Sequence, residues 1–231
     1  MRASFSVTER RAASCCTAAV ILLALLACAE RAAAGQIAVT VTDDEGRPLA
    51  DAVVVAVPAQ GALPPAQPVG HEVMDQVGQE FVPYVKPILV GSRVFFPNRD
   101  NIRHQVYSFS PAKSFELPLY AGTPAKPIVF DKPGVVVLGC NIHDWMIGYI
   151  YVSESPYFAK TGADGKAQIV DLPARTYEVR VWHPRQRKPE SETRRSAELT
   201  ANARVTISWK LALKPDIRIR RAPVPGGHGR Y

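Results

Sequence analysis

Cysteine is scarce in this chain, and its placement excludes a fold held together by disulfides. The 231 residues contain four cysteines, and three of them lie within the first 28 residues. If that N-terminal segment is removed on export, Cys140 is left alone and no intramolecular disulfide can form. A single thiol in an oxidising compartment is either buried and inert, or it is a ligand or a reactive group.

Long apolar runs are also missing. The run from Ala18 to Ala29 spans about a dozen residues, whereas a membrane-spanning helix needs roughly 20. Basic residues precede this run and small residues follow it, at Arg2, Arg10, Arg11 and Ala32 to Ala34. The pattern predicts a signal peptide over residues 1–34, cleaved after Ala34, and a periplasmic or otherwise exported protein without a transmembrane segment. The alternative is a lipoprotein, because Leu25-Leu26-Ala27-Cys28 resembles a lipobox that would leave a lipid anchor on Cys28.

Acidic residues are outnumbered by basic ones, 21 against 28, for a formal charge of +7. Loss of residues 1–34 takes away four basic and two acidic residues and leaves +5. Such a charge can steer association with an acidic protein surface or with anionic lipid, but it says nothing about the fold. An exported protein does not meet nucleic acid, so we expect no nucleic-acid partner.

Helical periodicity is nearly absent, and the patterns are those of strands. Ile37 to Val41 and Asp51 to Val57 predict a hairpin around a turn at positions 43–46. Near the other end, apolar residues alternate with polar ones at Val205, Ile207, Trp209, Leu211 and Leu213. The continuous apolar run Val135 to Leu138 is typical of a strand buried on both faces. The sequence therefore predicts an all-β fold.

A linker rich in Pro, Ala and Gly, from Pro58 to Gly70, separates the first hairpin from a second region. Phe81 to Val90 and Arg93 to Phe96 predict further strands there. At the C-terminus, residues 215–231 contain several arginines and a Pro-Gly-Gly sequence. This segment is expected to be a basic flexible tail.

The candidate chemistry lies in the loop Cys140-Asn141-Ile142-His143-Asp144-Trp145-Met146. Its C-x-x-H-x-x-M spacing allows a thiolate, an imidazole and a thioether to converge on one ion. Soft sulfur ligands combined with imidazole favour copper, and two histidines with one cysteine and a weak axial methionine are the ligands of blue-copper electron-transfer sites. The second histidine must come from elsewhere, and His104 is the best candidate because it ends a loop just before a strand.

Residues from about 81 to 152 resemble a plastocyanin- or amicyanin-type cupredoxin. The similarity includes the loop spacing, the sequence Val94-Phe95-Phe96-Pro97-Asn98 upstream of His104, and Phe130-Asp131-Lys132-Pro133-Gly134 before the cysteine strand. The resemblance implies a Greek-key β-sandwich and one type 1-like copper ion, with ligands His104, Cys140, His143 and Met146. Asn98 and Gly139 would shape the site without binding metal. Gln105 and Asp144 depart from the Asn and Pro that are common at these positions in the family.

The flanking segments resemble a small transthyretin-like or carboxypeptidase-regulatory-like (Ig-like) β-sandwich. The matching residues are Asp44 to Leu49, Ala163 to Ala167, Asp171 to Pro173 and Thr176-Tyr177, although Arg175 replaces the usual glycine. The expected domains are thus a discontinuous sandwich of residues 35–67 and 153–214, with a cupredoxin domain of residues 68–152 inserted into it. The composite resembles exported bacterial proteins of the methylamine-utilisation type.

Each site residue also has a structural interpretation. A lone cysteine is more often a small buried apolar residue, a lone loop histidine is usually solvated or hydrogen-bonded, and a lone methionine usually fills a core. The four residues together at this spacing favour metal binding. His71 and His183 have no comparable neighbours in the sequence and are expected to be structural, whereas His228 falls in the tail.

The ligand set implies one-electron transfer with a redox protein partner, either a cytochrome or a dehydrogenase. No nucleophile with a base, no paired carboxylates and no open site with three nitrogen ligands is evident, so an enzyme is not expected. Two alternatives stay open. The protein could deliver or buffer copper, or it could be a metal-free interaction module of the cell envelope.

Overall fold

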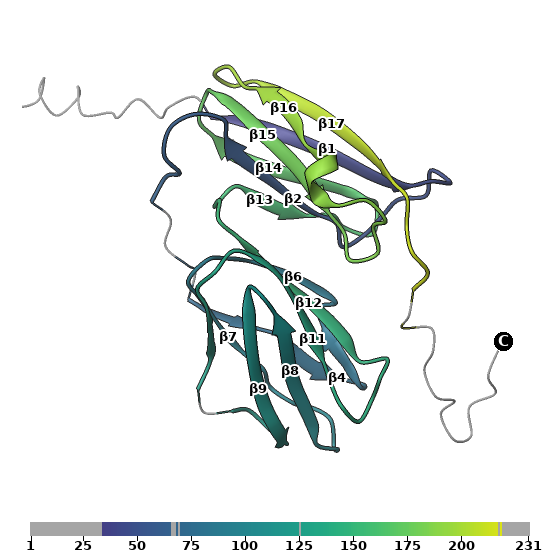
Figure 1. Cartoon of the computed structure of the whole chain (residues 1–231). Coiled ribbons are helices and arrows are strands. Elements are labelled where there is room, and N and C mark those ends of the chain that lie inside the picture. Colours follow the sequence, from purple (N-terminus) through teal and green to yellow (C-terminus); the bar gives the residue numbers. More distant parts are fainter. Residues whose placement is uncertain (1–33, 66–67, 69, 125, 217, 219–231) are drawn as a thin grey trace, which may run out of the picture. The chain divides into compact units, whose positions relative to one another are not determined.

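A computed structural model describes residues 34–216 and 218, apart from 66, 67, 69 and 125. These residues form strands β1 to β17, and the 3-10 helix η1, Glu190–Thr193, is the one helical element among them (Figure 1). The predicted all-β fold class is therefore confirmed. No helix in this part of the chain is long and apolar enough to cross a membrane. The predicted signal peptide, Cys28 and most of the predicted tail lie outside the described residues.

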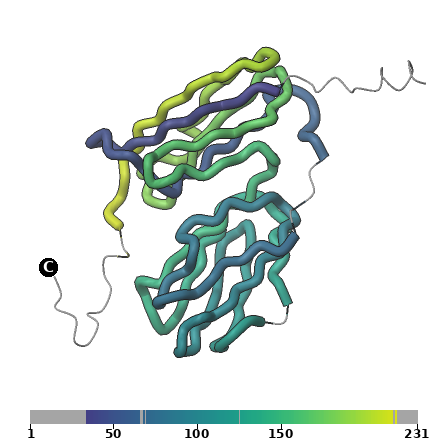
Figure 2. Tube along the Cα trace, turned by 180° about the vertical axis from the view of Figure 1, so that it is seen from behind, coloured from purple at the N-terminus to yellow at the C-terminus, as the bar shows by residue number. Residues whose placement is uncertain are grey.

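Two sheets are built from strands near both ends of the described chain, in the orders β14-β1-β17 and β13-β2-β15-β16. Their strands are β1 (Gly35–Asp43), β2 (Val53–Pro58), β13 (Phe158–Lys160), β14 (Lys166–Leu172), β15 (Thr176–Trp182), β16 (Arg195–Glu198) and β17 (Arg204–Leu211). β1 pairs antiparallel with β14 and parallel with β17, so the purple and yellow segments run side by side in Figure 2. The predicted hairpin of β1 and β2 is wrong, because β2 pairs with β13 and β15 in the other sheet; a turn between two β-rich runs does not show that the runs pair with each other. The two sheets share one hydrophobic core, which includes Ile37, Val54, Tyr177 and Trp209.

Two further sheets are built from the central part of the chain, in the orders β10-β7-β3 and β6-β12-β11-β8-β9, with β4 and β5 forming a separate hairpin. Their strands are β3 (His71–Val73), β4 (Asp75–Val77), β5 (Glu80–Val82), β6 (Val85–Leu89), β7 (Ser92–Phe95), β8 (His104–Ser110), β9 (Lys113–Tyr120), β10 (Ile128–Phe130), β11 (Gly134–Gly139) and β12 (Ile147–Ser153). A second core, which includes Phe96, Phe130, Leu138 and Ile150, lies among these strands. Together these strands form a second β-sandwich around that core.

The alternation predicted near the C-terminus is confirmed in β17. Ile207, Trp209 and Leu211 are buried, while the polar residues between them are exposed. Side chains of a strand point to opposite faces in turn, so the apolar set can cover a core while the polar set meets solvent. Hydrophobic burial of this one face is what fixes the register of β17 against β1.

The prediction that β11 is buried on both faces is wrong. Val136 and Leu138 are fully buried, but Val137 is 39% exposed and Val135 is only partly covered. The strand has one face on the core and one face outward. A short apolar run fits either arrangement, because its residue types do not distinguish a strand covered on both sides from one covered on a single side.

The segment from Phe81 to Val90, predicted as one strand, forms the two strands β5 and β6. Pro83 lies between them and has no N–H to donate to a strand ladder, which ends the pairing there. β5 pairs antiparallel with β4, whereas β6 pairs parallel with β12. The break lets one segment serve two separate sheets.

Candidate metal centre

His104 is the first residue of β8, and the loop before it is folded by Asn98. The Asn98 side chain is buried; its Nδ2 donates to the carbonyl of Ile102 at 2.8 Å and to that of Tyr120 at 2.9 Å. Its Oδ1 accepts the backbone N–H of Asp100 at 3.0 Å. These three hydrogen bonds hold the loop against β9 and set where β8 begins.

The loop from Cys140 to Met146 joins β11 to β12. Its first turn follows Gly139, which pairs with Tyr107 of β8. A Cβ on Gly139 would lie 2.7 Å from the Tyr107 ring, so no larger residue fits there without movement. At the other end, the N–H of Met146 donates to the carbonyl of His143 at 3.0 Å, which closes the loop tightly.

Three of the predicted ligands lie together. The ligand atoms of His104, Cys140 and His143 are all within 4.8 Å of one another. His104 Nδ1 lies 3.9 Å from Cys140 Sγ, and the two imidazole rings are 5.1 Å apart between centroids. His104 and Cys140 are buried, whereas His143 is half-buried, so His143 is the most accessible of the three residues.

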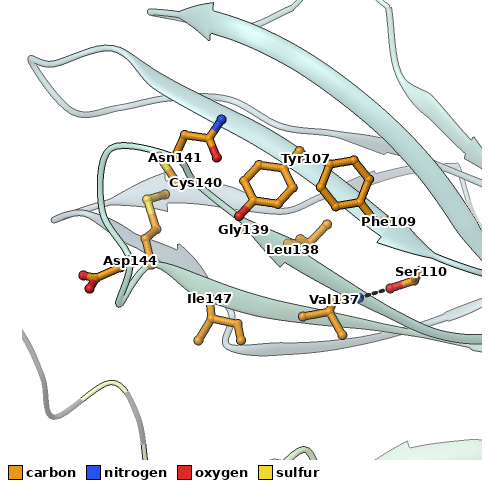
Figure 3. Close-up of a pocket in the computed structure, with 11 residues that line it drawn as sticks. Tyr107, Phe109, Ser110, Val137, Leu138, Gly139, Cys140, Asn141, Asp144 and Ile147 are labelled. Atoms are coloured by element: carbon orange, nitrogen blue, oxygen red, sulfur yellow. Dashed lines mark hydrogen bonds between the residues drawn. The ribbon is translucent and has the colours of Figure 1, made fainter.

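Met146, the fourth predicted ligand, shares its surroundings with Cys140. It is 1% exposed and belongs to the same hydrophobic core as Cys140. Both residues also line one pocket of about 460 Å³. Figure 3 shows this pocket with Tyr107 and Phe109 on one side and Asp144 and Ile147 on the other.

The hydrogen bonding of the two histidines matches what a bound ion requires. His104 Nε2 contacts Asp100 Oδ2 at 2.7 Å, which leaves Nδ1 directed at Cys140. His143 Nδ1 is buried and, among the described residues, has no hydrogen-bond partner. An unpaired buried polar atom costs about 1–3 kcal/mol. A metal ion beside His143 Nδ1 would remove this cost, so the residues present fit such an ion.

The types of ligand atom restrict which metal ion could bind here. Two imidazole nitrogens and one thiolate suit copper or zinc, and a thioether as a further ligand would favour copper. Burial lowers the pKa of His143 below its ordinary value, and repulsion from His104 adds to this effect when the His104 ring is protonated. A neutral imidazole is the form that binds a metal, and a lowered pKa keeps the ring in that form.

His71 and His183, predicted to be structural, lie outside this group. His71 is on β3 and packs edge-on against Phe95, with ring centroids 5.3 Å apart. His183 follows β15; it is buried, and its Nδ1 accepts the N–H of Arg185 at 3.2 Å. Burial lowers the pKa of His183 to about 4, so its ring is neutral in the folded protein at pH 7.

Sequence reasoning missed Asp100, the carboxylate that contacts His104. Burial pulls its pKa upward, but hydrogen bonds from Gln79 and His104 outweigh this effect and leave the pKa below its ordinary value. The one available signal was its position four residues before His104. In a loop, that spacing alone does not show which way a side chain points.

No family model and no curated protein matches the chain. Among solved structures, it is similar to a novel purple cupredoxin from Nitrosopumilus maritimus at 24% identity, covering 36% of this chain and 98% of that one, with a TM-score of 0.31. A point mutant of amicyanin in its oxidised state matches at 22% identity, 36% and 83% coverage, and a TM-score of 0.34. A Cu-containing nitrite reductase from Thermus scotoductus matches at 27% identity with 50% and 28% coverage and a TM-score of 0.34.

Proposed function

We propose that the protein is an exported mononuclear copper protein that carries single electrons. In this proposal His104, Cys140, His143 and Met146 hold one type 1-like copper ion. Two observations carry it: one ligand atom each of His104, Cys140 and His143 lie within 4.8 Å of one another, and the buried Nδ1 of half-buried His143 has no hydrogen-bond partner among the described residues. A bound copper ion would supply a Cu(II)/Cu(I) couple, because thiolate favours the oxidised ion and thioether the reduced one.

The protein side chains around the site suit this role. His104 is the first residue of β8, Cys140 directly follows β11, and both are buried, so they can move little when the charge of the ion changes. Little movement means little reorganisation on electron transfer. The donor set is complete without substrate, which favours electron transfer over catalysis.

The route to a partner is proposed to pass through His143. Its ring is half-buried and lies 5.0 Å from that of Trp145 between centroids, tilted by 52°. The neighbouring Ile142 is 50% exposed. A small apolar surface beside a half-buried ligand is suited to brief contact with a redox partner, which we propose to be a cytochrome or a dehydrogenase.

The proposal extends to export and to the domain plan. The layout of residues 1–34 supports secretion to the periplasm. The alternative to cleavage after Ala34 is an exported lipoprotein with a lipid anchor on Cys28. The shared core of strands from residues 35–58 and 158–211 supports a discontinuous sandwich of the transthyretin-like kind, with the cupredoxin domain inserted.

Two competing functions fit the structure less well. Copper delivery to another protein requires ligands that can be reached, yet His104 is 0% and Cys140 is 3% exposed. A metal-free interaction module would leave the buried nitrogen of His143 unpaired for no benefit. The burial of the ligands and the unpaired nitrogen thus both favour a retained ion.

The test is a visible and electron paramagnetic resonance spectrum of the purified protein after Cu(II) is added and the excess removed. We expect an intense absorption band at roughly 600 nm, as for copper bound by a thiolate, with a small hyperfine splitting. Cys140→Ser should abolish the band and keep the fold, because it removes the thiolate but little volume. His71→Asn, at a histidine outside the site, is the matched control and should keep the band. If the wild type shows only the weak visible absorption of Cu(II) without a thiolate ligand, the proposal is refuted.

A further inference from the structure

The side chain of Asp100 contacts two separate parts of the chain. Its Oδ1 accepts the backbone N–H of Gly78 at 2.6 Å. Its Oδ2 accepts the N–H of Gln79 at 2.8 Å and contacts Nε2 of His104 at 2.7 Å. One carboxylate therefore connects the turn between β4 and β5 with the first residue of β8.

The turn is shaped to offer these two N–H groups. Gly78 and Gln79 have φ angles of +62° and +61°, as in the two-residue turns that close β-hairpins. Gln79 is in the left-handed region that non-glycine residues avoid, so the surrounding contacts must hold it there. Asp100 provides two of those contacts.

The same carboxylate fixes which nitrogen of His104 is free. A carboxylate accepts hydrogen bonds, so the contact at Nε2 requires the ring proton to be on that nitrogen. Nδ1 is then unprotonated, and it is the nitrogen that lies 3.9 Å from Cys140 Sγ. Carboxylates behind a ligating histidine are known to set its tautomer and to increase its basicity.

The charge of Asp100 lies close to the site and is shielded from water. Its side chain is 13% exposed, and the His104 side chain between it and the thiol is 0% exposed. A shielded negative charge beside a ligand stabilises the more positive of two metal oxidation states. Asp144 also lies near the site but is exposed, so solvent screens its charge.

We propose that Asp100 is a positioning residue that holds His104 with its proton on Nε2 and biases the site towards Cu(II). The second half of this statement rests on the proposed copper function. The first half concerns the protein without metal and can be tested separately.

Two variants separate position from charge. Asp100→Asn keeps an oxygen that can accept the His104 N–H but removes the charge. Asp100→Ala removes both. Asp75→Asn is the matched control, because Asp75 is a carboxylate on β4, in the hairpin that Asp100 contacts, and it bonds Arg99 and not His104.

The first measurement is the ring ¹⁵N spectrum of His104 in the metal-free full-length protein. We expect the Nε2–H tautomer in the wild type, in Asp100→Asn and in Asp75→Asn, and a mixture of tautomers in Asp100→Ala. A wild type with the proton on Nδ1 would overturn the positioning role whether or not copper binds. If Asp100→Ala does not fold, the tautomer of His104 in the wild type still tests the positioning role of Asp100.

The second measurement is the affinity for Cu(II) and Cu(I) and the reduction potential. Loss of an outer partner of a ligating histidine lowers metal affinity about 10- to 100-fold, and we expect Asp100→Asn to weaken Cu(II) more than Cu(I). Each tenfold change in the ratio of the two affinities raises the potential by about 59 mV for one electron. An Asp100→Asn potential equal to that of Asp75→Asn would overturn the charge effect. A wild type that binds no copper would overturn both this effect and the proposed function, while the tautomer result would stand.

Discussion

Gly139→Ala should destabilise the protein at the point where β11 delivers Cys140. The added Cβ would lie 2.7 Å from both Cζ and Oη of Tyr107, whereas ordinary contacts begin near 3.4 Å. Tyr107 must therefore move. Its ring is half-buried and borders the pocket of about 460 Å³, so it has room to turn outward.

The size of the effect follows from this room to move. Overpacking a well-filled site typically lowers the free energy of unfolding by about 1–3 kcal/mol. Because the Tyr107 ring has room to move, we expect Gly139→Ala to lower it by about 1–2 kcal/mol. For a chain of this length, each kcal/mol lowers the melting temperature by about 2–4 °C. We therefore expect a loss of about 2–8 °C in the metal-free protein, measured by circular dichroism.

Two further variants make the test specific. In a Tyr107→Ala background, Gly139→Ala should be close to neutral, because the obstructing ring is gone; the difference is the coupling energy of the pair. Gly162→Ala is the control, since its Cβ would meet only the side-chain Oδ1 of Asp164, at 3.3 Å. If Gly139→Ala and Gly162→Ala melt at the same temperature, the steric reasoning is wrong.

Two other predictions concern the core and a buried histidine. Leu138→Ala should lower the free energy of unfolding by about 2–5 kcal/mol. Val137→Ala, on the outward face of the same strand, should lower it far less. Equal losses in urea unfolding would contradict the assigned faces of β11. The pKa of His183 is lowered to about 4 by burial, so the unfolded chain takes up a proton first as the pH falls, and stability should decrease between pH 6.5 and 4. The lowered pKa can change the free energy of unfolding by at most about 3 kcal/mol over this pH range. His183→Asn should therefore flatten the pH dependence of the unfolding midpoint. An unchanged slope would show that another group is responsible.

Much of the candidate site could be predicted because its information is local. Cys140, His143 and Met146 lie within one seven-residue loop, and His104 stands at the start of a strand. Spacing and residue type were enough to group them. The structure adds the distances among three of the four.

Asp100 could not be predicted, because its role depends on contacts with residues 78 and 79 in a distant turn. The same is true of Tyr107, whose ring covers Gly139 through pairing between strands. Periodicity describes one strand at a time and does not say which side chains meet across a sheet. The error at Val137 has the same origin, because an apolar residue does not reveal whether its face of the strand is covered.

The parallel pairing of β1 with β17 has a consequence for how the chain matures. Gln36 lies opposite Arg204, so this sheet cannot be completed until nearly the whole chain has emerged. Contacts between residues far apart in sequence form slowly, whereas the strands of residues 71–153 pair only among themselves, over shorter separations than that of Gln36 and Arg204. The sandwich that contains the candidate site can therefore assemble while the strand that completes the other sandwich is still being synthesised.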